Sequence, residues 1–262
     1  MNTLTKHWFA FLYAIAFLTR IPVPDLTSTL KQNKSAIGQV SVYYYPLVGL
    51  IVGACLVALY FSFQLSSPGL HLIPEKTALI AVLVLVVWCL ITGGLHLDGL
   101  ADAGDAWVGG YGDKQRTLDI MKDPYVGPMG LMLVVLVLLL KFAALWLVLK
   151  EQSWWLLLAA PVLARFLILP LFKFTPYVRE KGWGSDIAKG INSIALIAIT
   201  AIIGILAVLA FQQQTLLVLA VIAAIFVLAR NMMMQRLGGT TGDTAGALIE
   251  VSEAFILVVA VI

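Results

Sequence analysis

Apolar stretches separated by short polar connections make up most of the chain. Seven of these stretches come within a few residues of the length of about 20 that a bilayer-spanning helix requires. They cover approximately residues 43–65, 77–97, 128–149, 154–171, 191–211, 215–230 and 244–262. The pattern predicts an all-α fold in which residues 1–262 form one integral membrane domain, a polytopic helical bundle with about seven transmembrane helices.

A shorter apolar run, from Trp8 to Leu18, precedes the first of these stretches. A signal peptide has a similar pattern, but no small-x-small cleavage site follows this run, and Arg20 stands where such a site belongs. We therefore expect a retained helix, which either spans the membrane or lies at its interface.

The composition agrees with this pattern. Hydrophobic residues make up 61% of the chain and charged residues only 12%, whereas a soluble domain has about a quarter charged residues. A water-soluble globule is thereby excluded, and the lipid bilayer is the expected surroundings. The net charge of +3 is too small to indicate a nucleic-acid partner.

Basic residues are distributed unevenly between the two sides of the predicted bundle. If the seven stretches cross in turn, twelve Lys and Arg residues fall on one side, and only Lys76 and Lys150 fall on the other. Lys and Arg accumulate in cytoplasmic loops, so the first side is predicted to be cytoplasmic. The twelve are Arg20, Lys31, Lys34, Lys114, Arg116, Lys122, Lys173, Arg179, Lys181, Lys189, Arg230 and Arg236.

The segment from Gly93 to Asp105 carries the clearest candidate chemistry. Asp98, Asp102 and Asp105 are spaced i, i+4 and i+7, which places them within about 60° of one another around a helix. Carboxylates so arranged repel one another, and oxygen ligands suit Mg²⁺ or Mn²⁺. The sequence predicts a metal site here, with a solvated polar helix end as the alternative. His96 in the same segment either binds substrate or makes one structural hydrogen bond.

The charged decapeptide Lys114–Asp123 predicts a short helix on the same side of the membrane. Its Arg116 and Lys122 lie close in sequence to the aspartates. They either bind phosphate groups or form salt bridges with Asp119 and Asp123.

A second candidate segment, Arg236 to Gly246, opens the last apolar stretch. Glycines and threonines before a helix present backbone N–H groups and hydroxyls at its positive end, which suits an anion. The segment lacks the Lys of a Walker loop and follows no strand, so it is not a P-loop. Asp243 either caps the helix or joins the metal site.

Four ionisable residues lie inside the apolar stretches: Lys141, Arg165, Glu250 and Glu253. A charge in the bilayer interior is expensive, so we expect either ion pairs or an aqueous cavity. The sequence suggests a structural Arg165–Glu250 pair. Lys141 is expected to extend its ammonium group outward to the nearer membrane surface.

Four parts of the chain together resemble the cobalamin synthase family, the adenosylcobinamide-GDP ribazoletransferases. They are Leu18 to Pro24, Gly93 to Asp105, Ile120 to Asp123 followed by Gly127, and Gly238 to Thr244. The resemblance extends over the whole chain in order. One departure is Pro128-Met129, where some relatives have a more polar pair, so no contact is assigned to these two positions.

The resemblance implies a reaction, a cofactor and a location. The 3′-hydroxyl of α-ribazole, or of its 5′-phosphate, attacks the cobinamide-side phosphorus of adenosylcobinamide-GDP, and GMP leaves. Mg²⁺ is the implied cofactor. The cytoplasmic (inner) membrane of a bacterium or archaeon is the implied location, with the active site facing the cytoplasm. Whether the protein forms a homo-oligomer stays open.

Together, the residues and the resemblance give the candidate site. The catalytic candidates are Asp98, Asp102, Asp105 and Asp243, of which the first three are the expected metal ligands. The candidates for substrate binding are His96, Arg116, Lys122, Asp123, Arg236, Gly238, Gly239, Thr240 and Thr241.

Three other functions fit parts of the pattern. CDP-alcohol phosphotransferases perform similar chemistry, but their Asp-rich motif is absent in its own form, because Ala106-Trp107 follows Asp102-Ala103-Gly104-Asp105. A cation or corrinoid transporter explains the spans, but no internal repeat is visible. A membrane scaffold gives no reason for three aspartates on one helical face.

Overall fold

The computed structural model describes residues 2–66, 69, 73–179 and 190–262. All regular secondary structure in this part of the chain is helical, and the β-pairing seen there is one isolated bridge between Tyr177 and Thr240. The predicted all-α membrane fold is confirmed. Lys181 and Lys189, two of the twelve sorted cations, lie outside the described residues.

The helices of the described residues follow one another along the chain. They are α1 (Thr3–Leu18), α2 (Thr27–Ser41), η1 (Val42–Tyr44), α3 (Tyr45–Ser66), α4 (Pro74–Thr92), α5 (Leu95–Gly109), α6 (Lys114–Ile120), α7 (Pro128–Lys150), α8 (Leu156–Phe166), α9 (Ile168–Phe174), α11 (Ser193–Phe211), η3 (Gln212–Gln214), α12 (Thr215–Leu237) and α13 (Gly242–Ala260).

Five helical stretches of the described chain are long and apolar enough to cross a membrane. They are Asn33–Ser66, Pro74–Thr92, Pro128–Lys150, Leu156–Phe174 and Ser193–Leu237. The last contains two helices, α11 and α12, which η3 joins. α13 has 19 residues but is not among the five stretches, and it carries Asp243, Glu250 and Glu253. α1 has 16 residues, about 24 Å of helix, which is shorter than a typical span.

One predicted span was too long. The stretch 77–97 ends as a helix at Thr92, because Gly93 and Gly94 both adopt left-handed conformations, with φ of 63° and 68°. Glycine adopts such angles without the steric cost that a Cβ imposes. The chain changes direction at these two residues, and the aspartates therefore lie on a separate helix, α5, rather than at the end of α4.

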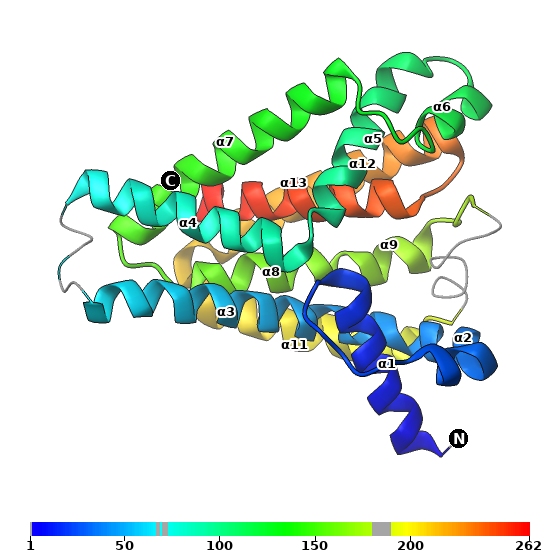
Figure 1. The fold of residues 1–262 in the computed structure, drawn as a ribbon, viewed down its shortest axis with the longest axis horizontal. Coiled ribbons are helices and arrows are strands. Elements are labelled where there is room, and N and C mark those ends of the chain that lie inside the picture. Colours follow the sequence, from blue (N-terminus) through cyan, green and yellow to red (C-terminus); the bar gives the residue numbers. More distant parts are fainter. Residues whose placement is uncertain (1, 67–68, 70–72, 180–189) are drawn as a thin grey trace.

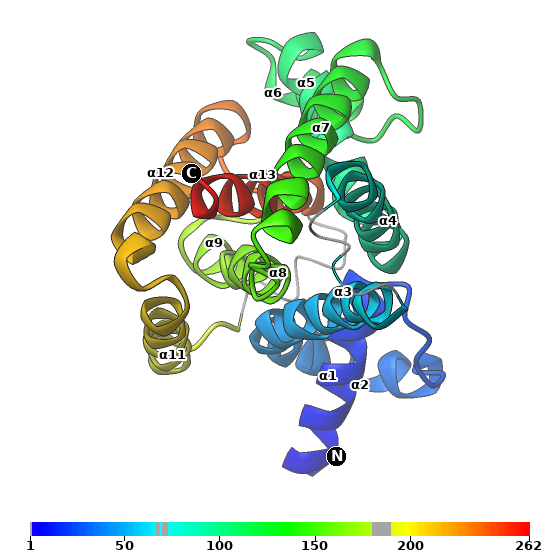
Figure 2. The same ribbon diagram turned by 90° about the vertical axis from the view of Figure 1, so that its left-hand side faces the viewer.

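The long helices run roughly along the longest axis of the molecule (Figure 1). The C-terminus of α3 and the N-terminus of α4 lie at one end of the bundle, and α2, α5 and α6 lie at the other (Figure 1). Lys34, Lys114 and Arg236 belong to elements that reach this second end. Viewed along the bundle, α13 lies in the middle and packs against α5, α7, α8 and α12 (Figure 2).

A buried charge cluster of Lys141, Arg165, Glu250 and Glu253 joins α7, α8 and α13. The Nζ of Lys141 lies 2.8 Å from an oxygen of Glu250 and 2.6 Å from an oxygen of Glu253. Arg165 pairs with Glu253 and donates to the carbonyl oxygen of Pro161. Both expectations for these residues were wrong: Arg165 does not pair with Glu250, and Lys141 is 1% exposed rather than extended outward.

Candidate active site

The N-terminus of α13 lies directly against α5. A Cβ at Gly99 would lie 2.7 Å from the backbone oxygen of Asp243, so only a glycine allows the two backbones to approach so closely. Gly99 stands between Asp98 and Asp102 in the sequence. The contact therefore brings Asp243, from the far end of the chain, to the carboxylates of α5.

The three carboxylates of Asp98, Asp102 and Asp243 influence one another electrostatically. Burial raises the pKa of Asp102 from its ordinary value to about 7, and the negative charges of Asp98 and Asp243 add to the increase. Asp98 is exposed, while Asp102 and Asp243 are half-buried. The site is thus negatively charged, accessible, and disposed to bind either a proton or a cation.

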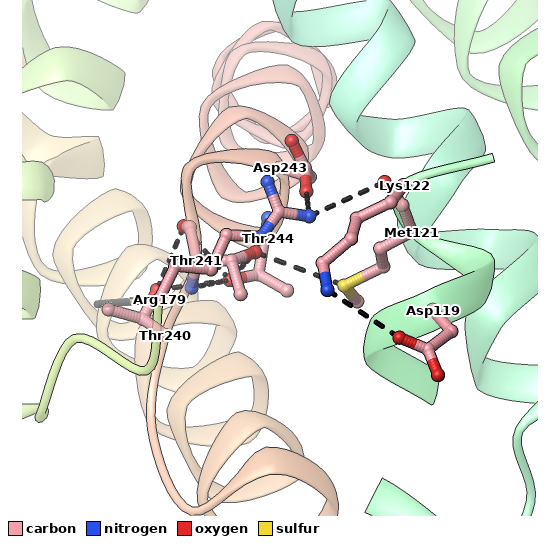
Figure 3. A network of polar contacts seen from close by, with 8 residues as sticks. All are labelled: Asp119, Met121, Lys122, Arg179, Thr240, Thr241, Asp243 and Thr244. Carbon is pink, nitrogen blue, oxygen red and sulfur yellow. Dashed lines mark hydrogen bonds and ion pairs between the residues drawn. The ribbon is translucent and has the colours of Figure 1, made fainter. Parts of the chain in front are cut away.

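Arg179 belongs to this site, although no sequence pattern distinguished it from the other cations on the predicted cytoplasmic side. Its Nη2 donates to Oδ2 of Asp243 at 2.6 Å and lies 3.4 Å from the backbone oxygen of Met121 (Figure 3). Backbone pairing fixes its segment: the N–H of Val178 donates to the oxygen of Thr240 at 2.9 Å, and the N–H of Thr240 donates to the oxygen of Pro176 at 2.8 Å.

Asp105 has a different position from the other aspartates of α5. Its carboxylate accepts hydrogen bonds from the N–H groups of Gly127, at 2.6 Å, and Gly130, at 2.9 Å. These groups lie at the N-terminus of α7, where unpaired N–H donors favour an anion. Although Asp98 and Asp105 share a face of α5, seven residues separate them by about 10 Å along the axis. This geometry accounts for Asp105 as a cap of α7, and its expected role as a metal ligand stays a prediction.

The remaining carboxylates fit a magnesium ion by their chemistry. No three His, Cys, Asp or Glu side chains in the described part of the chain are close enough together to hold a metal by themselves. Mg²⁺ is commonly bound by one or two carboxylates together with waters and substrate phosphates. Asp98, Asp102 and Asp243 supply oxygen donors and unneutralised negative charge, which is what such a site requires of the protein.

The glycines of the second candidate segment have structural reasons for their identity. Gly238 ends α12 in a left-handed conformation with φ of 69°. A Cβ at Gly239 would overlap the carbonyl oxygen of Pro176. Gly239 thereby permits the backbone pairing that holds Arg179 in place. A role for either glycine in binding substrate stays a prediction.

The threonine hydroxyls of this segment point inward. Thr240, Thr241 and Thr244 are all buried. Thr241 is the N-cap of α13 and forms a capping box with Thr244, while the hydroxyls of Thr240 and Thr244 lie 3.0 Å apart. Capping accounts for these hydroxyls, and phosphate binding by Thr240 and Thr241 stays a prediction. Asp243 is not the capping residue, so the alternative in which it joins the carboxylate site is favoured.

The cations predicted to bind substrate have other partners or lie on the surface. Arg236 donates to the backbone oxygen of Trp107 at 2.6 Å, and its guanidinium lies 4.3 Å from the ring centre of Tyr111. Lys122 forms an exposed salt bridge of 3.5 Å with Asp119. Arg116 and Asp123 are exposed as well. Their roles in substrate binding stay predictions.

A cavity of about 280 Å³ opens beside the carboxylates. Asp98, Arg179 and Asp243 contribute its charged lining, and His96 also lines it. His96 is 4% exposed, and neither of its ring nitrogens has a hydrogen-bond partner among the described residues. A buried polar group without a partner is uncommon in proteins, so His96 is well suited to bind a ligand in this cavity.

Comparison with known proteins identifies the family. Residues 10–261 match the cobalamin-5-phosphate synthase family. The chain belongs to this family. Its relatives include the adenosylcobinamide-GDP ribazoletransferases of Stutzerimonas stutzeri (strain A1501), 42% identical over 94% of this chain and 95% of the relative, and of Pseudomonas syringae pv. syringae (strain B728a), 44% identical over 94% and 96%. No solved structure matches the chain.

Membership of the cobalamin-5-phosphate synthase family confirms the resemblance seen in the sequence. The chain is an enzyme, a transferase of cobalamin biosynthesis, and it is a multi-pass membrane protein. The transporter and scaffold alternatives are thereby set aside.

Proposed function

We propose that this chain transfers the adenosylcobinamide-phosphate group from adenosylcobinamide-GDP to the 3′-hydroxyl of α-ribazole or of its 5′-phosphate, with release of GMP. The observation that carries this proposal is the convergence of Asp98, Asp102 and Asp243 with Arg179 beside a cavity, which Asp98, Asp243 and Arg179 line. The products are adenosylcobalamin or its 5′-phosphate.

The reaction requires a base and a means of bearing negative charge on the phosphates. A bond forms between the ribose 3′-oxygen and the cobinamide-side phosphorus, and the bond from that phosphorus to the oxygen of GMP breaks. The attacking hydroxyl must lose its proton. One carboxylate of the site accepts this proton. In the metal-free protein the pKa of Asp102 is raised to about 7, so Asp102 is suited to act as this base when it does not itself coordinate the metal, because a general base works best when its pKa lies near the working pH.

Asp98, Asp102 and Asp243 are the residues that would hold Mg²⁺. When bound, the ion neutralises charge on the pyrophosphate and on the departing GMP. Arg179 fixes the carboxylate of Asp243 through their ion pair. The second nitrogen of its guanidinium fork can bind a phosphate oxygen, so this arginine serves both to position Asp243 and to bind substrate.

The active site is proposed to face the cytoplasm at the inner membrane. The uneven distribution of Lys and Arg supports this orientation, and α2, α5 and α6 with their charged residues lie at one end of the bundle (Figure 1). Soluble nucleotides reach the site from that side, while the bilayer surrounds the apolar part of the bundle.

The deciding experiment measures GMP release. The full chain, purified in detergent or in lipid vesicles, is supplied with adenosylcobinamide-GDP and α-ribazole, with Mg²⁺ or with EDTA. We expect one GMP for each corrinoid consumed, and loss of turnover in EDTA that added Mg²⁺ restores. Absence of GMP release with both substrates and Mg²⁺ would refute the reaction. Undiminished turnover in EDTA would refute the metal.

A further inference from the structure

We propose that the cavity beside the carboxylates binds the base of the acceptor nucleoside, and that it selects a flat, largely apolar bicyclic heteroaromatic base with one free ring nitrogen, to which His96 donates a hydrogen bond. This inference rests on the proposed function and adds the location and chemical character of one substrate site.

The walls of the cavity suit an aromatic ring. Four aromatic side chains line it, from α1, α3, α9 and the segment that follows α9: Phe17, Tyr45, Phe172 and Tyr177. Phe172 and Tyr177 meet edge to face with ring centres 5.9 Å apart, and Phe17 stacks on Tyr45 at 6.2 Å. Aromatic side chains that line a cavity favour stacked or edge-to-face contact with a further aromatic ring inside it.

The size of the cavity decides which substrate it takes. A volume of about 280 Å³ lies just below the range of roughly 300–1,000 Å³ for small-molecule sites. A bicyclic base with part of its ribose fits this space. The corrin ring with its amide side chains is far larger, so the corrinoid must lie outside the cavity. It lies beyond the charged rim, which Asp98, Arg179 and Asp243 form.

The polarity of the cavity argues against guanine as the occupant. A guanine edge carries several donors and acceptors, and each one buried without a partner weakens binding. Apart from the charged rim and the two tyrosines, His96 supplies the polar side-chain atoms of the lining. A neutral imidazole has one N–H donor, which matches a base that has a single ring-nitrogen acceptor.

The position of His96 also fits the chemistry at the rim. His96 lies two residues before Asp98 on α5, and a Cβ at Gly246 of α13 would lie 3.3 Å from the Cα of His96. The histidine therefore lies between the same two helices that carry the carboxylates. A base bound at His96 leaves its ribose directed toward Asp98 and Asp243, where the 3′-hydroxyl is needed.

The test compares His96→Phe with His7→Phe, a matched change at an exposed histidine of α1. GMP release is measured against α-ribazole and against its indole counterpart, in which C–H replaces the free ring nitrogen. We expect wild type to discriminate against the indole nucleoside by about tenfold in kcat/KM, the effect of one hydrogen bond. His96→Phe should abolish this discrimination and leave the KM for adenosylcobinamide-GDP unchanged, whereas His7→Phe should behave as wild type.

A second pair of variants tests the aromatic wall. Phe172→Ala removes a wall of the cavity, and Phe211→Ala removes an equally buried phenylalanine of α11 that does not line it. We expect Phe172→Ala to raise the KM for α-ribazole by at least about tenfold, while Phe211→Ala leaves it unchanged.

Two results would overturn the inference and leave the proposed reaction standing. One is a rise in the KM for adenosylcobinamide-GDP, instead of α-ribazole, in both cavity variants. The other is equal discrimination against the indole nucleoside in wild type and His96→Phe. If wild type releases no GMP at all, the reaction itself fails. The base site is then tested separately, by equilibrium dialysis of labelled α-ribazole with the purified chain. If His96→Phe binds α-ribazole as tightly as wild type, the proposed base site is overturned.

Discussion

The aspartates of α5 are equivalent in sequence spacing but differ in surroundings, and this difference predicts how their variants behave. Asp98→Asn, Asp102→Asn and Asp243→Asn each remove one negative charge from the proposed metal site. We expect each to lower kcat by about a hundredfold or more, because several kcal/mol of transition-state stabilisation are lost at about 1.4 kcal/mol per decade. Folding should be unaffected or improved, since repulsion between like charges is relieved.

Asp105→Ala should give the opposite result. It leaves the N–H groups of Gly127 and Gly130 without their acceptor, which costs about 1–3 kcal/mol of stability. Activity per folded molecule should stay near that of wild type. The measurement is GMP release per folded protein, together with the thermal unfolding midpoint. A hundredfold loss of turnover in Asp105→Ala at unchanged stability would restore Asp105 to the catalytic set.

The raised pKa of Asp102 predicts how stability depends on pH in the metal-free protein. Its pKa rises to about 7 in the folded chain, above the ordinary value for the unfolded chain, so the unfolded state releases this proton first. Stability should therefore fall as the pH rises from about 4 to about 7. Asp102→Asn should lack this part of the decline. Unfolding midpoints in EDTA across that range are the measurement, and identical slopes in wild type and variant would contradict the assignment.

Sequence reasoning singled out Asp98, Asp102 and Asp105 because repeated acidic residues at a membrane boundary are rare without a cause, and it gave Asp243 either a capping role or a place in the same site. It did not find Arg179. Its link to Asp243 depends on backbone pairing between residues more than sixty positions apart in the chain, and no local pattern encodes such pairing. The expected outward position of Lys141 and the expected Arg165–Glu250 pair were wrong for the same reason, because tertiary packing sets how the helices are rotated against one another.

The loop between α12 and α13 connects the architecture to the chemistry. Gly239→Val would force a side chain into the Pro176 carbonyl and disrupt the pairing that holds Arg179. We expect a lower unfolding midpoint and a lower kcat together, because Asp243 loses its ion-pair partner. GMP release per folded protein and thermal unfolding are measured on the same sample.

A matched control for this variant exists in α11. Gly204→Val also adds a β-branched side chain to a glycine, but a Cβ at Gly204 meets no other atom within 4 Å. It should therefore leave turnover unchanged. If Gly239→Val keeps its stability and kcat and raises only the KM for adenosylcobinamide-GDP, the loop binds phosphate directly and the pairing argument fails.

The apolar stretches of the sequence predicted most helices well, because about 20 apolar residues in succession have few other stable arrangements. The ends of the helices were predicted less accurately. The sequence contains Gly93-Gly94 but does not show that both residues adopt left-handed conformations. The predicted span 77–97 therefore continued past the end of α4 into α5. The helix α2 was not predicted, since its mixed polar and apolar residues have no long apolar run.

The buried charge cluster holds the bundle together through three helices and predicts a non-additive response to mutation. Lys141→Met leaves Glu250 buried without its cation. Removing one partner of a buried ion pair lowers the free energy of unfolding by about 3–5 kcal/mol. Adding Glu250→Gln removes the stranded charge, so the double variant should recover most of that loss. Unfolding free energies of the two single variants and the double variant test this coupling, and additive losses would show that the pair acts independently.

The orientation of the whole molecule can be tested through the end of the bundle that carries α2, α5 and α6. After Cys55 and Cys89 are replaced by serine, single cysteines are introduced at Lys34, Lys114 and Arg236, and at Gln152 as the opposite-side control. In intact cells an impermeant thiol reagent should label the cysteine at Gln152 but none of the other three, because the Lys and Arg distribution places those three in the cytoplasm. Permeabilised cells should allow labelling at the exposed positions Lys34 and Lys114. External labelling at two or more of the three would reverse the orientation, and with it the supply of substrates from the cytoplasm.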